Sequence, residues 1–171
     1  MRVVQVEHLG KNHNLCFSWY KDVSDKDRIL NLIMSRDPSI TNLISDEFTL
    51  LIAAKRALIN RNTNSLKTEN IYSELLYCLS PTTKIKSAID NFGVTKDFES
   101  IIIAKFDSDI NTFTQELNSL QLGLEWTPSC SQIQGAANSK VLSEVYGFDS
   151  SKSPKDYNRL IWSSIAAKGF L

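Results

Sequence analysis

The chain has 171 residues, of which 42% are hydrophobic and 22% are charged, as in an ordinary globular protein. Its nineteen basic residues balance nineteen acidic ones, which argues against nucleic-acid binding through bulk charge alone. No apolar run approaches the ~20 residues that cross a bilayer, and no signal-peptide pattern is present, so we expect an intracellular protein with no membrane partner.

The length and the cysteines favour one domain. A chain of this size, taken as a single domain over residues 1–171, buries roughly two-thirds of its unfolded surface. Its cysteines are odd in number and far apart in the sequence, at Cys16, Cys78 and Cys130. We therefore expect no disulfide framework.

The charge is uneven along the chain. Residues 55–86 carry six basic groups against two acidic ones, which is a net charge of +4. The basic groups are Lys55, Arg56, Arg61, Lys67, Lys84 and Lys86. Lysines that are simply solvated on a helix and a loop explain this excess, and so does a surface for an anionic partner.

The N-terminal residues predict a β-hairpin followed by a helix. Met1–Glu7 and Leu15–Tyr20 are rich in β-branched and aromatic residues, as strands are, and the polar segment between them contains Gly10. Ser24 resembles the start of a capping box, and Pro38 cannot continue a helix. The apolar face of this helix consists of Ile29, Leu30, Ile33 and Met34.

Three further helices are predicted between residues 45 and 93. Ser45–Asp46–Glu47 opens the first of them, and Asn70–Leu79 forms the second. Ser80–Pro81 starts the third, with serine as the cap and proline at the first helical position, and Gly93 is its expected left-handed stop. The first of the three is expected to bury Phe48, Leu51, Ile52, Ala54, Ala57 and Leu58.

The remaining residues predict two strands and three helices. Ser100–Phe106 is continuously apolar, which indicates a strand covered on both faces, and Leu124–Thr127 is consistent with an edge strand. Asp109 caps one helix, Ser139–Tyr146 is a short second one, and Ser153–Pro154 opens the last. The helix after Asp109 is expected to bury Ile110, Phe113, Leu117 and Leu120, and one face of the last helix consists of Tyr157, Leu160, Ile161, Ser164 and Ile165.

Together the elements predict an α+β fold, in which about six or seven helices surround a small mixed or antiparallel sheet.

The sequence contains no evident reaction centre. Glycine loops that cradle phosphates are missing, and we expect no cofactor and no metal. Three potential metal ligands lie close together in the sequence: His8, His13 and Cys16. With no fourth ligand nearby, they are better interpreted as turn histidines and a buried cysteine. Cys78 lies in an apolar helix that would keep its thiol protonated, and Asp107 and Asp109 fit helix capping better than magnesium binding.

Two segments are candidates for binding. Lys67–Thr68 and Ser80–Lys84 border the helix Asn70–Leu79 at opposite ends, and a helix of that length spans only about 15 Å. One extended strand could therefore contact both segments. A helix N-terminus at Ser80–Lys84 would also offer free N–H groups to a phosphate or a terminal hydroxyl, although a simple cap and turn explains the same residues.

Two stretches carry a family resemblance. Residues 48–58 read FTLLIAAKRAL and are followed by Lys67-Thr68 and Ser73-Glu74. Residues 78–94 read CLSPTTKIKSAIDNFGV, with a Leu-Ser-Pro turn, an alanine-led amphipathic helix and a Phe-Gly-Val stop. These motifs resemble the Cgi-type, kinase-binding subunit family of the KEOPS (EKC) tRNA-modification complex. The strand 101–106, the helix 141–148 and the last helix follow the family pattern as well.

The resemblance implies a function without catalysis. Members of this family bind the small atypical kinase/ATPase of KEOPS and help the complex to hold tRNA, including its 3′ CCA end. The complex makes threonylcarbamoyladenosine (t6A) beside the anticodon, and another subunit performs that chemistry. Similarity to the eukaryotic members implies a protein of the nucleus and cytoplasm.

The resemblance also points to two surfaces. We expect the tRNA-binding residues to be Arg61, Lys67, Thr68, Ser80, Pro81, Lys84 and Lys86. We expect the kinase-binding residues to be Leu160, Ser164, Phe170 and Leu171, because a Phe-Leu tail beyond the last helix is an exposed apolar element. Family members commonly have Arg where this chain has Glu69, and that reversal weakens phosphate attraction.

Two other functions stay open. One is an adaptor that regulates the kinase without contacting RNA, which Glu69 favours. The other is a cysteine- or metal-dependent hydrolase that uses His8, His13 or Cys16.

Overall fold

The structure is a computed structural model whose described residues form two compact units. The described residues are 1–8, 10–23, 27, 39–41, 44, 46–94, 100–126, 139–148 and 154–168. The sheet unit comprises Met1–Asn42 and Val94–Thr127, and the helical unit comprises Leu43–Gly93 and Pro128–Leu171. Each unit is thus built from two separate stretches of chain, and the expected single domain stays a prediction.

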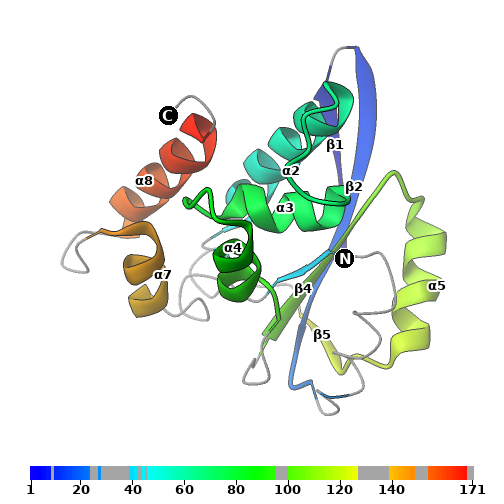
Figure 1. The fold of residues 1–171 in the computed structure, drawn as a ribbon. Helices are drawn as coiled ribbons and strands as arrows, with labels where there is room; N and C mark the ends of the chain where they lie inside the picture. The colour runs from blue at the N-terminus through cyan, green and yellow to red at the C-terminus, as the bar shows by residue number, and fades with distance from the viewer. Residues whose placement is uncertain are drawn as a thin grey trace. The chain divides into compact units, whose positions relative to one another are not determined.

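The sheet unit is built on a five-stranded sheet in which every described pairing is antiparallel. Its strands are β1 (Arg2–His8), β2 (Lys11–Lys21), β3 (Ser39–Thr41), β4 (Ser100–Phe106) and β5 (Leu124–Trp126). Their order is β1-β2-β4-β3, and β5 pairs with β2 beyond the end of β1 (Figure 1). The predicted hairpin, the strand Ser100–Phe106, the edge strand near Leu124 and the α+β class are confirmed.

Helix α5 (Ile110–Leu120) covers one face of this sheet. The buried cluster between them contains Cys16, Tyr20, Ile101 and Ile103 from the sheet and Phe113 and Leu117 from α5. Ile110 was expected on the buried face and is instead exposed. The helical period gives the direction of a side chain, but it does not show where along the helix contact with the sheet begins.

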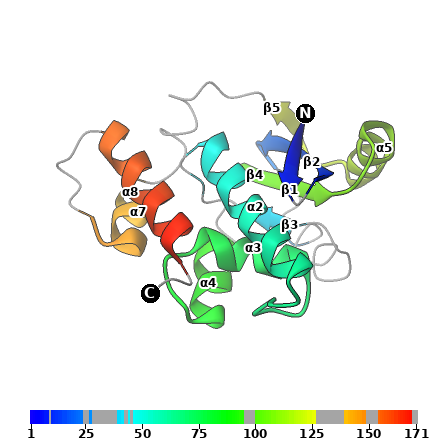
Figure 2. The ribbon, with the colours of Figure 1, turned by 90° about the horizontal axis from the view of Figure 1, so that it is seen from above.

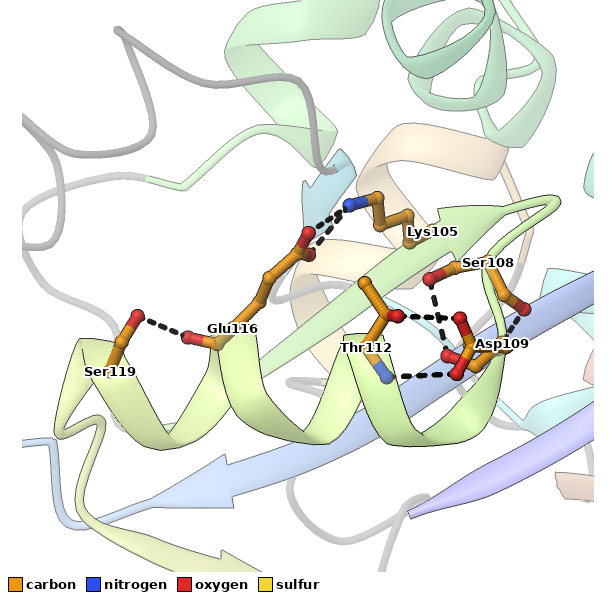
Figure 3. A network of polar contacts seen from close by, with 7 residues as sticks. Lys105, Ser108, Asp109, Thr112, Glu116 and Ser119 are labelled. Carbon is orange, nitrogen blue, oxygen red and sulfur yellow. Dashed lines mark hydrogen bonds and ion pairs between the residues drawn. The ribbon is translucent and has the colours of Figure 1, made fainter.

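Polar contacts fix the start and the middle of α5 (Figure 3). Asp109 caps the helix, accepting hydrogen bonds from the backbone N–H groups of Asn111 at 3.0 Å and Thr112 at 2.9 Å. The pKa of Asp109 is lowered, first by a hydrogen bond from the Thr112 hydroxyl and then by these backbone contacts. Farther along, Lys105 of β4 binds both carboxylate oxygens of Glu116 at 2.5 and 2.6 Å. The predicted capping role of Asp109 is confirmed.

The helical unit contains the other five helices of the described residues. They are α2 (Glu47–Asn62), α3 (Ile71–Leu79), α4 (Ile85–Phe92), α7 (Ser139–Tyr146) and α8 (Pro154–Ala167). Helix α2 packs against α3 and α8 (Figures 1 and 2), and its fully buried Ala53, Ala54 and Ala57 let the helix backbones approach closely. Among the helices of the described residues, none has the length and apolar character that crossing a bilayer requires.

Several sequence predictions concern residues outside the described ranges. These are the helix after Ser24, the cap at Ser153 and the end of the last helix at Gly169. Where the chain is described, Asp46 caps α2 and Asn70 caps α3, each through its side chain.

The end of α8 is held by two basic side chains. Arg56 of α2 donates to the backbone carbonyls of Ala166, at 3.4 Å, and of Lys168. The Lys168 ammonium is buried, donates to the carbonyls of Tyr77 and of Ser80 (2.8 Å for the latter), and lies 3.4 Å from the centroid of the Tyr77 ring. A cation at the carbonyl end of α3 complements the negative pole of that helix. The last turn of α8 is therefore tied to the turn that follows α3.

Gly93 ends α4 in a way that differs from the prediction. Its φ of −72° is not left-handed, so conformational freedom does not require glycine here. Steric space does, because a Cβ at this position would lie 2.6 Å from the Ile89 carbonyl oxygen.

We expect Gly93→Ala to lower the free energy of unfolding by about 1–3 kcal/mol, because a backbone atom cannot move aside as a side chain can. Urea denaturation measures the effect. Asn91→Ala, at an exposed position of the same helix, is the control and should change stability by less than about 0.5 kcal/mol. Equal stabilities of the two variants would contradict the steric argument.

Burial lowers the pKa of Lys168 from 10.5 to about 8, so the folded chain binds fewer protons than the unfolded chain between these values. The contribution of Lys168 to the free energy of unfolding therefore rises as the pH increases through this window. The neutral amine still has two N–H donors for its two carbonyl partners.

We expect the unfolding free energy of the wild type, relative to Lys168→Met, to increase between about pH 8 and about pH 10. Denaturant titrations at several pH values would measure it. Lys11→Met, at an exposed position of β2, is the control for replacing a lysine by methionine. A falling difference for Lys168→Met would show that the charged form is the stabilised one.

Candidate functional site

All seven predicted tRNA-binding residues lie in the helical unit, around α3. Arg61 is in the last turn of α2, and Lys67 and Thr68 lie in the α2–α3 loop. The turn between α3 and α4 contains Ser80, Pro81 and Lys84, and Lys86 is in the first turn of α4. The two segments thus border α3 at opposite ends, as predicted. A nine-residue helix is about 13 Å long, which is a short distance for an extended polynucleotide.

The basic side chains differ in their exposure. Lys67, Lys84 and Lys86 are exposed, while Arg61 is half-buried. Glu69, which follows Thr68 in the same loop, is exposed as well. The positive charge of the segment is therefore on the surface, together with one opposing carboxylate.

The predicted helix start at Ser80–Pro81 is wrong. Ser80 is the C-cap of α3, and its N–H donates to the Tyr77 carbonyl at 3.2 Å. Its hydroxyl accepts from the N–H of Thr82 at 3.2 Å, and the Thr82 hydroxyl accepts from the N–H of Lys84, also at 3.2 Å. These side-chain contacts give the backbone an alternative to helical bonding, so α4 begins four residues later, at Ile85.

The delayed start of α4 changes what the turn presents to a ligand. The free N–H groups of the first helical turn follow Lys84, not Ser80. Ser80 itself is fully buried, so its hydroxyl organises the turn from within. The contact of Ser80 and Pro81 with RNA stays a prediction.

The α2–α3 loop has an inward anchor that the sequence argument did not use. Glu74 is the only acid of α3 and is fully buried, and it accepts from the backbone N–H groups of Lys67 at 2.9 Å and Thr68 at 3.0 Å. The signal in the sequence was a single carboxylate in an otherwise apolar helix, because a buried charge of this kind needs hydrogen-bond partners.

The predicted kinase-binding residues fall on α8 and beyond it. Leu160 is 42% exposed and Ser164, one turn later, is half-buried. Both flank the fully buried row of Ile161 and Ile165. Phe170 and Leu171 lie outside the described residues.

One exposed apolar side chain of α2 was not expected from the sequence. Phe48 was expected in the core and is instead 51% exposed, with its ring edge-on to Trp162 at a centroid distance of 4.8 Å. The Trp162 indole N–H donates to the Thr49 hydroxyl at 3.1 Å, which holds the ring in place. The apolar residues of helix α2 cover more of its circumference than one buried face needs. This excess of apolar residues was the signal in the sequence that one of them would be exposed.

The proposed histidine and cysteine metal site is not assembled. Strand alternation places Cys16 on the face opposite to His13, because side chains of successive strand residues point to opposite faces. The Cys16 thiol donates to the Ser108 carbonyl at 3.2 Å, and His13 lies 2.8 Å from the Asp107 carboxylate. Within the described ranges, no three His, Cys, Asp or Glu residues are arranged to hold a metal ion.

Neither described cysteine is poised as a nucleophile. Burial raises the pKa of the Cys16 thiol, and it raises that of Cys78 to about 12. Both side chains are buried, so the thiolate that would attack a substrate is disfavoured. The predicted core position of Cys78 is confirmed.

Comparison with known proteins agrees with the resemblance seen in the sequence. Residues 20–169 match the model of the family described as "Kinase binding protein CGI-121". The chain is similar to the EKC/KEOPS complex subunit cgi121 of Schizosaccharomyces pombe, with 31% identity over 159 residues that cover 88% of this chain and 91% of the relative. It is also similar to the EKC/KEOPS complex subunit CGI121 of Yarrowia lipolytica, with 25% identity over 162 residues that cover 91% and 92% of the two chains.

A vertebrate relative matches over a shorter stretch. The EKC/KEOPS complex subunit TPRKB of Danio rerio is 33% identical over 54 residues, which cover 32% of this chain and 31% of the relative. The match to the family model, in contrast, extends over most of the sequence. The chain therefore belongs to the CGI-121 family of kinase-binding proteins.

Proposed function

We propose that this chain is a non-catalytic subunit of an EKC/KEOPS complex, where it binds the kinase subunit and supports t6A modification by contacting the 3′ end of tRNA. The observation that carries the proposal is the family match over residues 20–169, supported by relatives that are named as EKC/KEOPS subunits. The protonated, buried thiols fit a subunit that acts through its surfaces. We expect it in the nucleus and cytoplasm.

The proposed kinase-binding surface is the Leu160 and Ser164 flank of α8, together with the tail residues Phe170 and Leu171. An exposed leucine beside a buried helical row can enter a partner pocket without disturbing the core of its own unit. Phe48 of α2, whose ring contacts Trp162 of α8, is the comparison position for this assignment.

The proposed tRNA contact uses the exposed lysines at the two ends of α3. Lys67, Lys84 and Lys86 supply positive charge for phosphates, and the short length of α3 lets one single strand reach both ends.

An adaptor that regulates the kinase without contacting RNA is the alternative. Its support is the exposed Glu69, two residues from Lys67, which opposes phosphate binding at one of the two segments. Measuring the ATPase activity and the tRNA affinity of the kinase with and without this chain separates the two functions. An effect on ATPase activity alone would favour the adaptor.

We expect Leu160→Asp to weaken kinase binding about tenfold or more, because a charge would have to be buried in an apolar contact. Isothermal titration calorimetry with the purified kinase subunit would measure it. Leu124→Asp, at a 61% exposed position of β5, is the matched control and should bind normally.

The tail is tested with Phe170→Ala combined with Leu171→Ala. If both this double variant and Leu160→Asp bind the kinase at wild-type strength, the surface is wrongly placed. A loss of kinase binding with Phe48→Asp alone would move the kinase-binding surface to the Phe48–Trp162 contact.

We expect Lys67→Glu and Lys84→Glu each to weaken tRNA binding several-fold and to flatten its salt dependence, by about 0.7 in the log–log slope for each lost single-strand phosphate contact. Lys11→Glu, at an exposed position of the sheet unit, should have little effect. Fluorescence anisotropy with intact and CCA-trimmed tRNA would measure affinity. Identical binding of both tRNAs by all variants would refute the contact with the 3′ end.

A further inference from the structure

Glu74 is a buried charge to which the proposed function gives no role. Its side chain is fully buried within α3, and desolvating a carboxylate is costly unless its oxygens are hydrogen-bonded. Both oxygens of the Glu74 carboxylate accept hydrogen bonds. The carboxylate joins the end of α2 to the loop that presents Lys67.

Each oxygen of this carboxylate has a separate task. Oε1 accepts from the side-chain amide of Asn60, in the last turn of α2, at 2.7 Å. Oε2 accepts from the backbone N–H groups of Lys67 at 2.9 Å and Thr68 at 3.0 Å, and from the Thr68 hydroxyl at 2.9 Å. Successive N–H groups that converge on one oxygen fix the local backbone, because both peptide planes must face the same point.

The contacts also sort the two neighbouring side chains. Thr68 directs its hydroxyl inward, where Glu74 and the carbonyl of Asn70, at 3.0 Å, compete for its single proton. Lys67, one residue earlier, is exposed. The loop before it is fixed as well, since the N–H of Ser65 donates to the Asn60 carbonyl at 2.8 Å. The position of Lys67 is therefore set by its backbone while its side chain extends into solvent.

We propose that Glu74 is a positioning residue for RNA binding, which holds the α2–α3 loop in the conformation that directs the Lys67 ammonium at a phosphate. This inference rests on the proposed tRNA contact. A loop fixed before binding does not have to be ordered by the RNA, so the affinity gains what ordering would cost. Thr68 then acts through Glu74.

If Glu74 acts only through its negative charge, its removal should change tRNA affinity in the opposite direction from its removal as the anchor of the loop. Removing a negative charge near a phosphate site strengthens RNA binding if charge alone matters. Removing the anchor of the loop weakens it. Glu74→Ala separates the two effects, and Glu69→Ala, the loss of an exposed acid in the same loop, is the matched control that should bind tRNA more tightly.

We expect Glu74→Ala to weaken tRNA binding about three- to tenfold, which corresponds to the net value of about one hydrogen bond. In a double-mutant cycle, Glu74→Ala should add little to Lys67→Ala, because a misplaced lysine and a missing lysine lose the same contact. It should be additive with Lys84→Ala, across α3. Hydrogen exchange should show faster exchange at the amides of residues 67 and 68, while kinase affinity stays unchanged.

Two further variants keep the test decisive if Glu74→Ala does not fold. Glu74→Gln keeps a carbonyl oxygen for the two N–H groups, and its amide can donate to Asn60 after that side chain flips, so it should bind tRNA at least as tightly as the wild type. Thr68→Val preserves shape but removes the hydroxyl, and it should weaken tRNA binding non-additively with Lys67→Ala.

Glu74→Ala overturns the proposal if it binds tRNA at wild-type strength or more tightly; where that variant does not fold, Thr68→Val takes its place. Full additivity of the variant's effect on tRNA affinity with that of Lys67→Ala would overturn the proposal as well. If the wild-type chain, alone and bound to the kinase subunit, binds no tRNA, the tRNA contact itself is refuted and this inference falls with it. Faster exchange at residues 67 and 68 in Glu74→Ala would then still show that the carboxylate orders the loop.

Discussion

The buried ammonium of Lys168 is the contact on which the geometry of the helical unit most depends. It occupies the carbonyl end of α3 and bonds to both sides of the bend at Ser80, while Arg56 holds the backbone of the same residue. Glu74 has the corresponding role toward the other end of α3. A nine-residue helix is too short to be stable alone. Lys168 and Glu74, which carry opposite charges, hold the segments at its two ends.

This arrangement explains how a neutral chain presents a basic surface. The charges that organise the helical unit are inside and satisfied by backbone groups, and the lysines that remain on the surface are free to act at a distance. The chemically reactive side chains have structural positions: Cys16 and Cys78 are buried, and His13 contacts the Asp107 carboxylate. The description of the family names kinase binding, which is an interaction through a surface.

Much of the fold was predictable because local rules and tertiary packing agree there. The hairpin, the β4 strand and the Asp109 cap follow from alternation, apolar runs and capping chemistry, each of which acts over a few residues. The start of α4 was not predictable in the same way, because serine before proline is typical of both a helix start and a turn. In the structure it is a turn, in which the hydroxyls of Ser80 and Thr82 accept from backbone N–H groups and the Ser80 carbonyl accepts from Lys168, 88 positions away.

The candidate site was predictable in part for a similar reason. The basic residues stand out in the sequence, so Lys67, Lys84 and Lys86 were chosen as candidates directly, and all three are exposed in the structure. The role of Glu74 depends on which backbone groups converge on it, and that information is tertiary. Phe48 was misassigned because a helix with apolar residues on several sides does not reveal which side stays uncovered.

The division of each unit into two stretches of chain has a consequence for synthesis on the ribosome. The β1–β2 hairpin emerges before β4, but β2 pairs with β4 in a register that joins Lys21 to Ser100, 79 residues later. At about 5–20 residues per second, that edge of β2 waits several seconds for its partner. During the wait it is an unpaired apolar strand of the kind that associates with other chains. Until β4 has been made, the nascent sheet is thus exposed to pairing with other chains.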